Sequence, residues 1–169
     1  MDRLWVVKGK VVFIAILSFI AISAIVFYIS WRAEERQWRL TQAAHDGDLI
    51  GVKRLFAAGA KLDATPGNQN VFGEPALLEA ASQGHDKIVL FFLDHGANIN
   101  VRDNCKNTAV NCAVIGGHFS TLQLLLSRGA NFNLWGEGYP LWNAENRNDM
   151  KMIDLLKAHG AKEQVTPQK

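Results

Sequence analysis

The chain has 169 residues and a formal net charge of +2, from 18 Lys and Arg against 16 Asp and Glu. Residues 1–10 hold the whole excess, residues 11–31 carry no charge, and the rest of the chain is electrically balanced. A balanced domain presents no positive surface to a phosphate backbone, which argues against a nucleic-acid partner. The length allows one domain with a real hydrophobic core.

An uncharged apolar run from Val11 to Ile29 dominates the start of the chain. About twenty helical residues span a hydrocarbon core of roughly 30 Å, so the run predicts a transmembrane anchor over residues 11–30 in a lipid bilayer. A cleavable signal peptide is the first alternative, but its apolar core is shorter, about 7–15 residues, and ends in a small-x-small cleavage site. A buried core helix is the second, but this run has no polar face.

The orientation of this anchor is weakly encoded. Three basic residues precede the run within the tail 1–10, and Arg32, Arg36 and Arg39 follow it closely. The positive-inside count is therefore a tie. We expect the short basic tail to stay in the cytoplasm and the larger domain to be exported. A cytoplasmic domain is the alternative.

Four Gly-Ala pairs organise the remaining chain, at positions 59–60, 96–97, 129–130 and 160–161. They are 37, 33 and 31 residues apart, a period typical of stacked repeats. Aligning the chain on these pairs gives four matching segments at 38–63, 75–100, 108–133 and 139–162. Residues 31–37 form a short stem before them, and residues 163–169 a tail after them.

Each segment predicts two short helices. The first carries an apolar residue followed three places later by alanine, such as Leu77 and Ala80, so that both lie on one face. A break follows at Gly47, Gly84, Gly117 and Asn148, residue types that can adopt the left-handed conformation that ends a helix. The second helix carries an apolar stripe and ends at the glycine of the Gly-Ala pair. One such unit cannot bury its apolar face alone, so neighbours must stack to form the core.

This sequence pattern closely resembles the ankyrin repeat. The core of that repeat reads T-P-L-H-x-A-A-x-x-G-H, then an apolar helix, then G-A-D-V-N. The matching residues include Thr108, Pro140, Gly84-His85, Gly117-His118, Gly96-Ala97-Asn98-Ile99-Asn100 and Gly129-Ala130-Asn131-Phe132-Asn133. The resemblance implies an all-α solenoid of about four helix-turn-helix repeats over residues 38–162, preceded by one transmembrane helix. Lys106 stands where the family usually has glycine, and Trp142 and Asn111 stand where it has a structural histidine.

The resemblance also implies a site. Partners of this fold usually lie across the concave face formed by first helices and finger tips, so we expect another protein, of unknown identity, to bind there. Phe72 and Trp135 are the sharpest candidates, since large aromatics on turns dominate interfaces; folding back over a neighbouring helix is the equal alternative. The expected contact residues are Gln69, Val71, Phe72, Glu74, Ser82, Gln83, Arg102, Asn104, Asn107, Ile115, Trp135, Asn146 and Arg147.

Catalytic chemistry has no signature in the sequence. No HExxH, P-loop or GxSxG motif occurs, and Cys105 and Cys112 form no CxxC pair. We read the cysteines as free thiols; a bond between them would need an oxidising compartment and Cα atoms within about 7 Å. We therefore expect no catalytic residue, metal, cofactor or small-molecule substrate.

The resemblance, together with the small size, suggests a bacterial inner-membrane protein with its ankyrin domain in the periplasm. The predicted function is a membrane-anchored, non-enzymatic binding module, such as an assembly factor or an inhibitor that neutralises an enzyme near the membrane. Two other hypotheses remain open. One is a structural subunit held in a membrane complex mainly by its transmembrane helix, and the other is a hydrolase with a site assembled from distant residues.

Overall fold

The computed structural model describes residues 2–64, 74–134 and 139–161, with side chains from residue 16 onward. These residues form eight α-helices and no strand. The chain divides into two compact units, residues 1–35 and residues 36–169, and each is described by itself.

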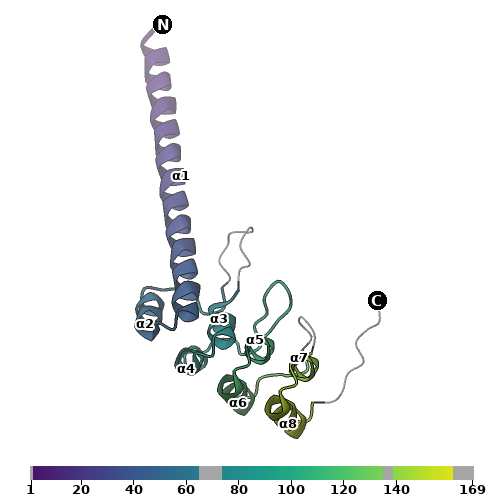
Figure 1. The fold of residues 1–169 in the computed structure, drawn as a ribbon. Coiled ribbons are helices and arrows are strands. Elements are labelled where there is room, and N and C mark those ends of the chain that lie inside the picture. Colours follow the sequence, from purple (N-terminus) through teal and green to yellow (C-terminus); the bar gives the residue numbers. More distant parts are fainter. Residues whose placement is uncertain (1, 65–73, 135–138, 162–169) are drawn as a thin grey trace, which may run out of the picture. The chain divides into compact units, whose positions relative to one another are not determined.

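Helix α1 runs from Asp2 to His45 without interruption (Figure 1). No glycine or proline occurs between Gly9 and Gly47, so no helix breaker ends it earlier. The predicted stem, residues 31–37, accordingly lies inside this helix. Every side chain from Ile16 to Glu34 is exposed, so the described part of the apolar run, residues 16–29, is not buried in a core. Among the described helices α1 alone is long and apolar enough to cross a membrane, judged by length and composition.

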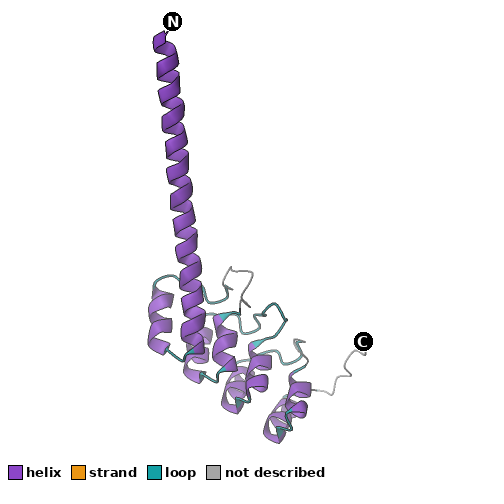
Figure 2. Ribbon diagram, turned by 45° about the horizontal axis from the view of Figure 1, so that its top comes forward, coloured by secondary structure: helices purple, strands orange, loops and turns teal. Residues whose placement is uncertain are grey.

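The second unit is a stack of four helical pairs. Residues 36–45, the end of α1, pair with α2, and three pairs follow as α3–α4, α5–α6 and α7–α8. Figures 1 and 2 show α3, α5 and α7 side by side in one row and α4, α6 and α8 in a second row. The bounds are α2 Leu49–Ala57, α3 Ala76–Ser82, α4 Asp86–Asp94, α5 Ala109–Gly116, α6 Phe119–Ser127, α7 Pro140–Asn146 and α8 Met150–Ala158. This arrangement confirms the predicted all-α solenoid.

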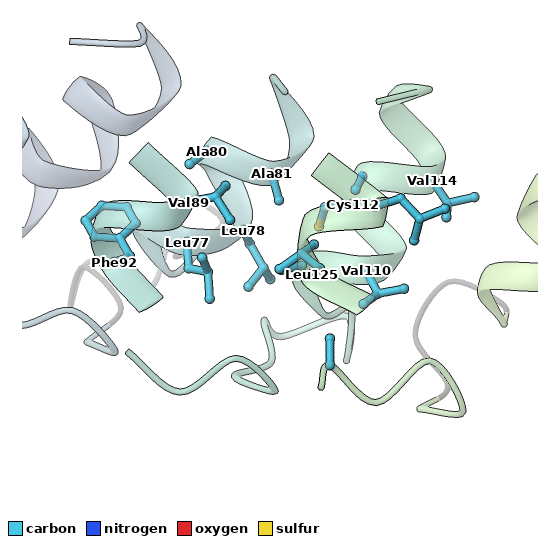
Figure 3. Packing of buried hydrophobic residues seen from close by; sticks show 14 of the residues in the cluster. Leu77, Leu78, Ala80, Ala81, Val89, Phe92, Val110, Cys112, Val114 and Leu125 are labelled. Carbon is cyan, nitrogen blue, oxygen red and sulfur yellow. The ribbon is translucent and has the colours of Figure 1, made fainter. Parts of the chain in front are cut away.

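One apolar core runs through the whole stack, from Leu40 in the first pair to Leu156 in the last. Figure 3 shows its centre, which includes Leu77 and Leu78 of α3 and Leu125 of α6. These three side chains are fully buried, as is the alanine pair of α3 that lets neighbouring helices approach closely. Successive pairs therefore shield one another's apolar surfaces, as the repeat pattern requires.

The breaks between paired helices lie where the sequence predicts them. Gly47, Gly84 and Gly117 have φ angles of 76°, 73° and 79°, and Asn148 takes their place in the last pair with a φ of 53°. The glycines of the four Gly-Ala pairs also have positive φ angles, from 82° to 93°. Left-handed backbone at each point stops one helix and turns the chain into the next segment.

Candidate protein-binding surface

The predicted contact residues lie on two kinds of element. Ser82, Gln83, Asn146 and Arg147 cluster at the C-terminal ends of α3 and α7, and Ile115 lies at the end of α5. The others belong to the fingers, the turns that join one helical pair to the next. Gln83, Ile115, Asn146 and Arg147 are exposed, and Ser82 is half-buried. Because α3, α5 and α7 lie side by side (Figure 2), these residues follow one row of helix ends.

The finger over residues 101–107 is held by its own hydrogen bonds. The backbone N–H of Asn107 donates to Asp103 Oδ1 at 2.7 Å, and its side-chain amide donates to Oδ2 at 3.2 Å. Lys106 sits in the left-handed region with a φ of 68°, and its carbonyl accepts a hydrogen bond from Arg102 Nε at 2.9 Å. This leaves Asn104 and Arg102 exposed on the turn.

Two predicted contact residues have a role inside the fold. Asn107 is only 6% exposed and bonds to Asp103, so the structure gives it a role in holding the finger and leaves little of it for a partner. Arg147 is exposed, but one of its guanidinium nitrogens donates to the carbonyl of Ile115 in the preceding pair at 2.8 Å.

The remaining predicted contact residues lie just before the second repeat and just before the fourth repeat. Glu74 is half-buried and lies two residues before α3 begins. Gln69, Val71, Phe72 and Trp135 lie outside the described residues.

Sequence reasoning missed a recurring contact between helical pairs. His85 Nε2 lies 2.9 Å from the carbonyl oxygen of His45, and His118 Nε2 lies 2.9 Å from that of Ser82. Arg147 makes the equivalent bond in the last pair. Each carbonyl belongs to the residue two places before a left-handed break, so the three bonds repeat one geometry. Gly-His pairs spaced 33 residues apart were the available signal.

The two residues that replace the family's structural histidine behave differently. Asn111 is fully buried and forms a capping box with Thr108, whose hydroxyl donates to Asn111 Oδ1 at 2.9 Å. This fixes the start of α5. Trp142 in the first turn of α7 is 41% exposed, which makes it a surface residue.

Among the described residues, three further histidines make contacts within the repeat stack. His95 and His159 each bond a carbonyl of their own helix, and His45 Nδ1 lies 3.1 Å from Glu79 Oε2. No group of three or more His, Cys, Asp or Glu that could hold a metal ion occurs in the part of the chain described. Cys105 is exposed, Cys112 is buried, and no disulfide joins them. We call the row formed by Ser82, Gln83, Ile115, Asn146 and Arg147 the helix-end row. It presents amide, guanidinium and aliphatic groups, which suit the binding of a protein.

Comparison with known proteins supports this interpretation. A family model for ankyrin repeats, in three copies, matches residues 40–134. The fourth helical pair, α7 and α8, lies beyond that match.

Proteins that are similar to this chain have very different names. E3 ubiquitin-protein ligase XBAT33 of Arabidopsis thaliana is 38% identical over 92 residues, which cover 52% of this chain and 17% of the ligase. Ankyrin repeat and KH domain-containing protein mask-1 of Caenorhabditis elegans is 35% identical over 103 residues, 61% of this chain and 4% of that protein. Potassium channel AKT2/3 of Arabidopsis thaliana is 32% identical over 88 residues, 52% of this chain and 11% of the channel. The chain thus spans less than a fifth of each of these relatives.

Proposed function

Because the chain belongs to the ankyrin repeat family, we propose that it is a non-enzymatic module that binds another protein and is anchored in a lipid bilayer through residues 11–30. Ankyrin repeats are protein-binding elements, and the repeats here carry that general role. The ligase, the KH-domain protein and the channel each contain a segment similar to this chain and have different names, which fits a domain that supplies binding alone.

The observation that carries the proposal is the exposed row at the ends of α3, α5 and α7. Gln83, Ile115 and Arg147 present an amide, an aliphatic and a guanidinium group. The backbone beneath them is fixed by the bonds of His118 to Ser82 and of Arg147 to Ile115. A surface held in place before a partner arrives loses less conformational entropy on binding, which favours affinity.

The membrane part rests on α1. Its apolar residues from Ile16 to Ile29 are exposed, and the segment has the length and composition of a spanning helix. Tyr28 and Trp31, with ring centroids 6.4 Å apart, lie where interfacial aromatic residues are common. We assign residues 1–10 to a cytoplasmic tail and residues 38–162 to an exported, periplasmic repeat domain. A reporter enzyme that is active on only one side of the membrane, fused after Lys169, tests this sidedness.

An anchor confines the repeats to a thin layer beside the bilayer. Confinement raises the effective concentration toward partners in the same layer without any new contact. The role this suits is assembly or inhibition of a membrane-near protein.

The experiment separates the binding surface from the anchor. The double variant Ile115→Glu with Arg102→Ala should abolish binding of the partner protein. Replacement of residues 11–29 by an unrelated transmembrane helix should preserve that binding. Gln123→Glu, on exposed surface of α6 away from the helix-end row, is the matched control. The reverse pattern, with loss only on replacing the helix, would support a structural subunit held by its membrane segment instead.

A further inference from the structure

The helix-end row continues into the first helical pair. His45 and Asp46 lie two places and one place before the left-handed break of their repeat, as Ser82 and Gln83 do in the next repeat. Both residues of the first pair are exposed. Equivalent positions therefore follow one another across the stack, two in each repeat.

The end of the row formed by the first two repeats carries two carboxylates. Asp46 Oδ1 accepts a hydrogen bond from Gln42 Nε2 at 2.9 Å, and Glu79 Oε2 lies 3.1 Å from His45 Nδ1. Within the described residues, neither carboxylate pairs with a lysine or an arginine. Glutamine carries no charge, and histidine carries one only when it is protonated. The negative charge at this end is therefore available to a partner.

The fourth repeat places an arginine at the opposite end. Arg147 is exposed, and its Nη1 donates to the carbonyl of Ile115 at 2.8 Å. The nearby acid Glu145 pairs instead with Lys157 of α8, at 3.8 Å. In the part of the chain that the structure describes, the guanidinium of Arg147 thus meets no carboxylate. Its remaining N–H groups form a planar fork that suits one.

Neutral groups separate the two charged ends. Ser82 and Gln83 are polar and uncharged, and Ile115 is 40% exposed. Next to Ile115 lies the exposed Gly116, which has no side chain. A Cβ on Gly116 would lie 2.5 Å from the carbonyl oxygen of Ser82, so the stacking of the repeats keeps this position bare. The backbone of a partner can therefore approach closely beside the isoleucine side chain.

We propose that the helix-end row, with its continuation into the first pair, selects a segment of a partner protein by the order of its charged and apolar groups. A cationic side chain of that segment meets Asp46 and Glu79. An apolar side chain lies against Ile115, and a carboxylate binds the guanidinium of Arg147. This order rests on the proposed function and gives the chemistry of the partner. Complementary charges at the two ends fix the direction in which the segment lies and exclude segments of the opposite order.

The spacing of the repeats sets the spacing of these groups. Packed helices lie about 9 Å apart, so Ile115 lies about 9 Å along the row from the basic end and about 18 Å from the acidic end. An extended chain advances about 3.3 Å per residue. About three residues should therefore separate the carboxylate from the apolar side chain, and about five or six should separate the apolar side chain from the cation.

A selection from random peptides tests this order. A phage-displayed library of random peptides, each about twelve residues long so that it covers the row, is panned on the full chain in phosphatidylcholine nanodiscs. Phage that bind empty nanodiscs are removed first. The enriched sequences should carry Lys or Arg near one end, Asp or Glu near the other, and an apolar residue between them at the spacing given above. Either chain direction satisfies this expectation.

Charge removal on both sides then assigns each contact, with peptide binding measured by fluorescence anisotropy. Arg147→Gln keeps an amide donor for the carbonyl of Ile115 and should weaken binding about fivefold, as expected for the loss of one ion pair. The loss should disappear for a peptide whose acidic residue is replaced by its amide. Asp46→Asn combined with Glu79→Gln should show the same dependence on the cationic residue of the peptide.

Two matched variants on α8 control for the overall charge of the chain. Lys151→Gln and Asp154→Asn remove exposed charges of either sign from α8 and should leave binding unchanged.

The variant Ile115→Glu separates failure of the surface from failure of the charge order. Enriched peptides that bind this variant as well as the natural chain would contradict the helix-end row as the binding surface, and with it the proposed function. Peptides that need Ile115 but show no fixed order of charges, or that bind the Arg147→Gln variant equally well, would overturn the charge order alone. A library that yields no binder would also overturn the charge order.

Discussion

The backbone N–H of Asn131 donates a 2.9 Å hydrogen bond to the side-chain oxygen of Asn100 in the preceding repeat. The same bond joins Asn98 to Asp63 one repeat earlier, also at 2.9 Å. Both acceptors are the last residue of the five-residue motif that starts with Gly-Ala. These bonds form a second set of contacts between neighbouring repeats, separate from those of His85 and His118.

Asn100→Ala should therefore lower the free energy of unfolding by about 1 kcal/mol, the usual net value of one hydrogen bond. Asn100→Asp should cost much less, because Asp63 already plays the same part with a carboxylate. Chemical denaturation of both variants measures the difference. Equal losses would show that the bond to Asn131 does not contribute to stability.

Lys106 holds left-handed backbone in the finger, at a φ of 68°. A residue with a Cβ costs about 1–2 kcal/mol there, and glycine avoids this cost. Lys106→Gly should raise the unfolding midpoint, by an amount reduced by the greater flexibility of glycine in the unfolded chain. Lys106→Ala is the control, since it removes the charge but keeps the Cβ; a similar gain from both variants would assign the effect to charge.

The two classes of left-handed glycine should respond differently to alanine. Gly96 has a φ of 86° and no atom within 4 Å of a Cβ, so Gly96→Ala should cost about 1–2 kcal/mol from backbone strain alone. Gly84→Ala should cost about 1 kcal/mol more, because the new methyl group displaces His118 from the Ser82 carbonyl. In a His118→Ala background this extra cost should vanish, and its persistence there would point to another cause.

Membrane integration should depend on the centre of the apolar run. Ile20→Arg places a charge there, at a cost of about 3 kcal/mol for insertion. The fraction of the chain that resists alkaline carbonate extraction should fall sharply. Ile20→Leu should extract like the natural chain. Unchanged resistance of the Ile20→Arg variant would argue against a spanning helix.

The order of helices, their breaks and their core could be predicted because each is encoded locally. Gly84 and Gly117 mark left-handed stops, and residues such as Leu77 and Leu122 recur at fixed offsets from them. These signals lie within one repeat, and repetition at four sites makes them hard to mistake.

Contacts between repeats were harder to predict. His118 was recognised as part of a break motif, but its reach to the carbonyl of Ser82 depends on how closely two repeats stack. Asn107 looked like a finger-tip contact, and its burial follows from the bond to Asp103 across the same turn. The uninterrupted helix could have been anticipated, since no breaker lies between Gly9 and Gly47.

Site-specific photo-crosslinking in intact membranes tests the central claim most directly. A photoreactive residue placed at Gln83 or Ile115 should give one discrete crosslinked protein in each case, of the same mass. The same residue at Gln123 or Lys151, exposed on α6 and α8, should give none. Crosslinks confined to α6 and α8, with none from Gln83 or Ile115, would contradict a partner held by the helix-end row.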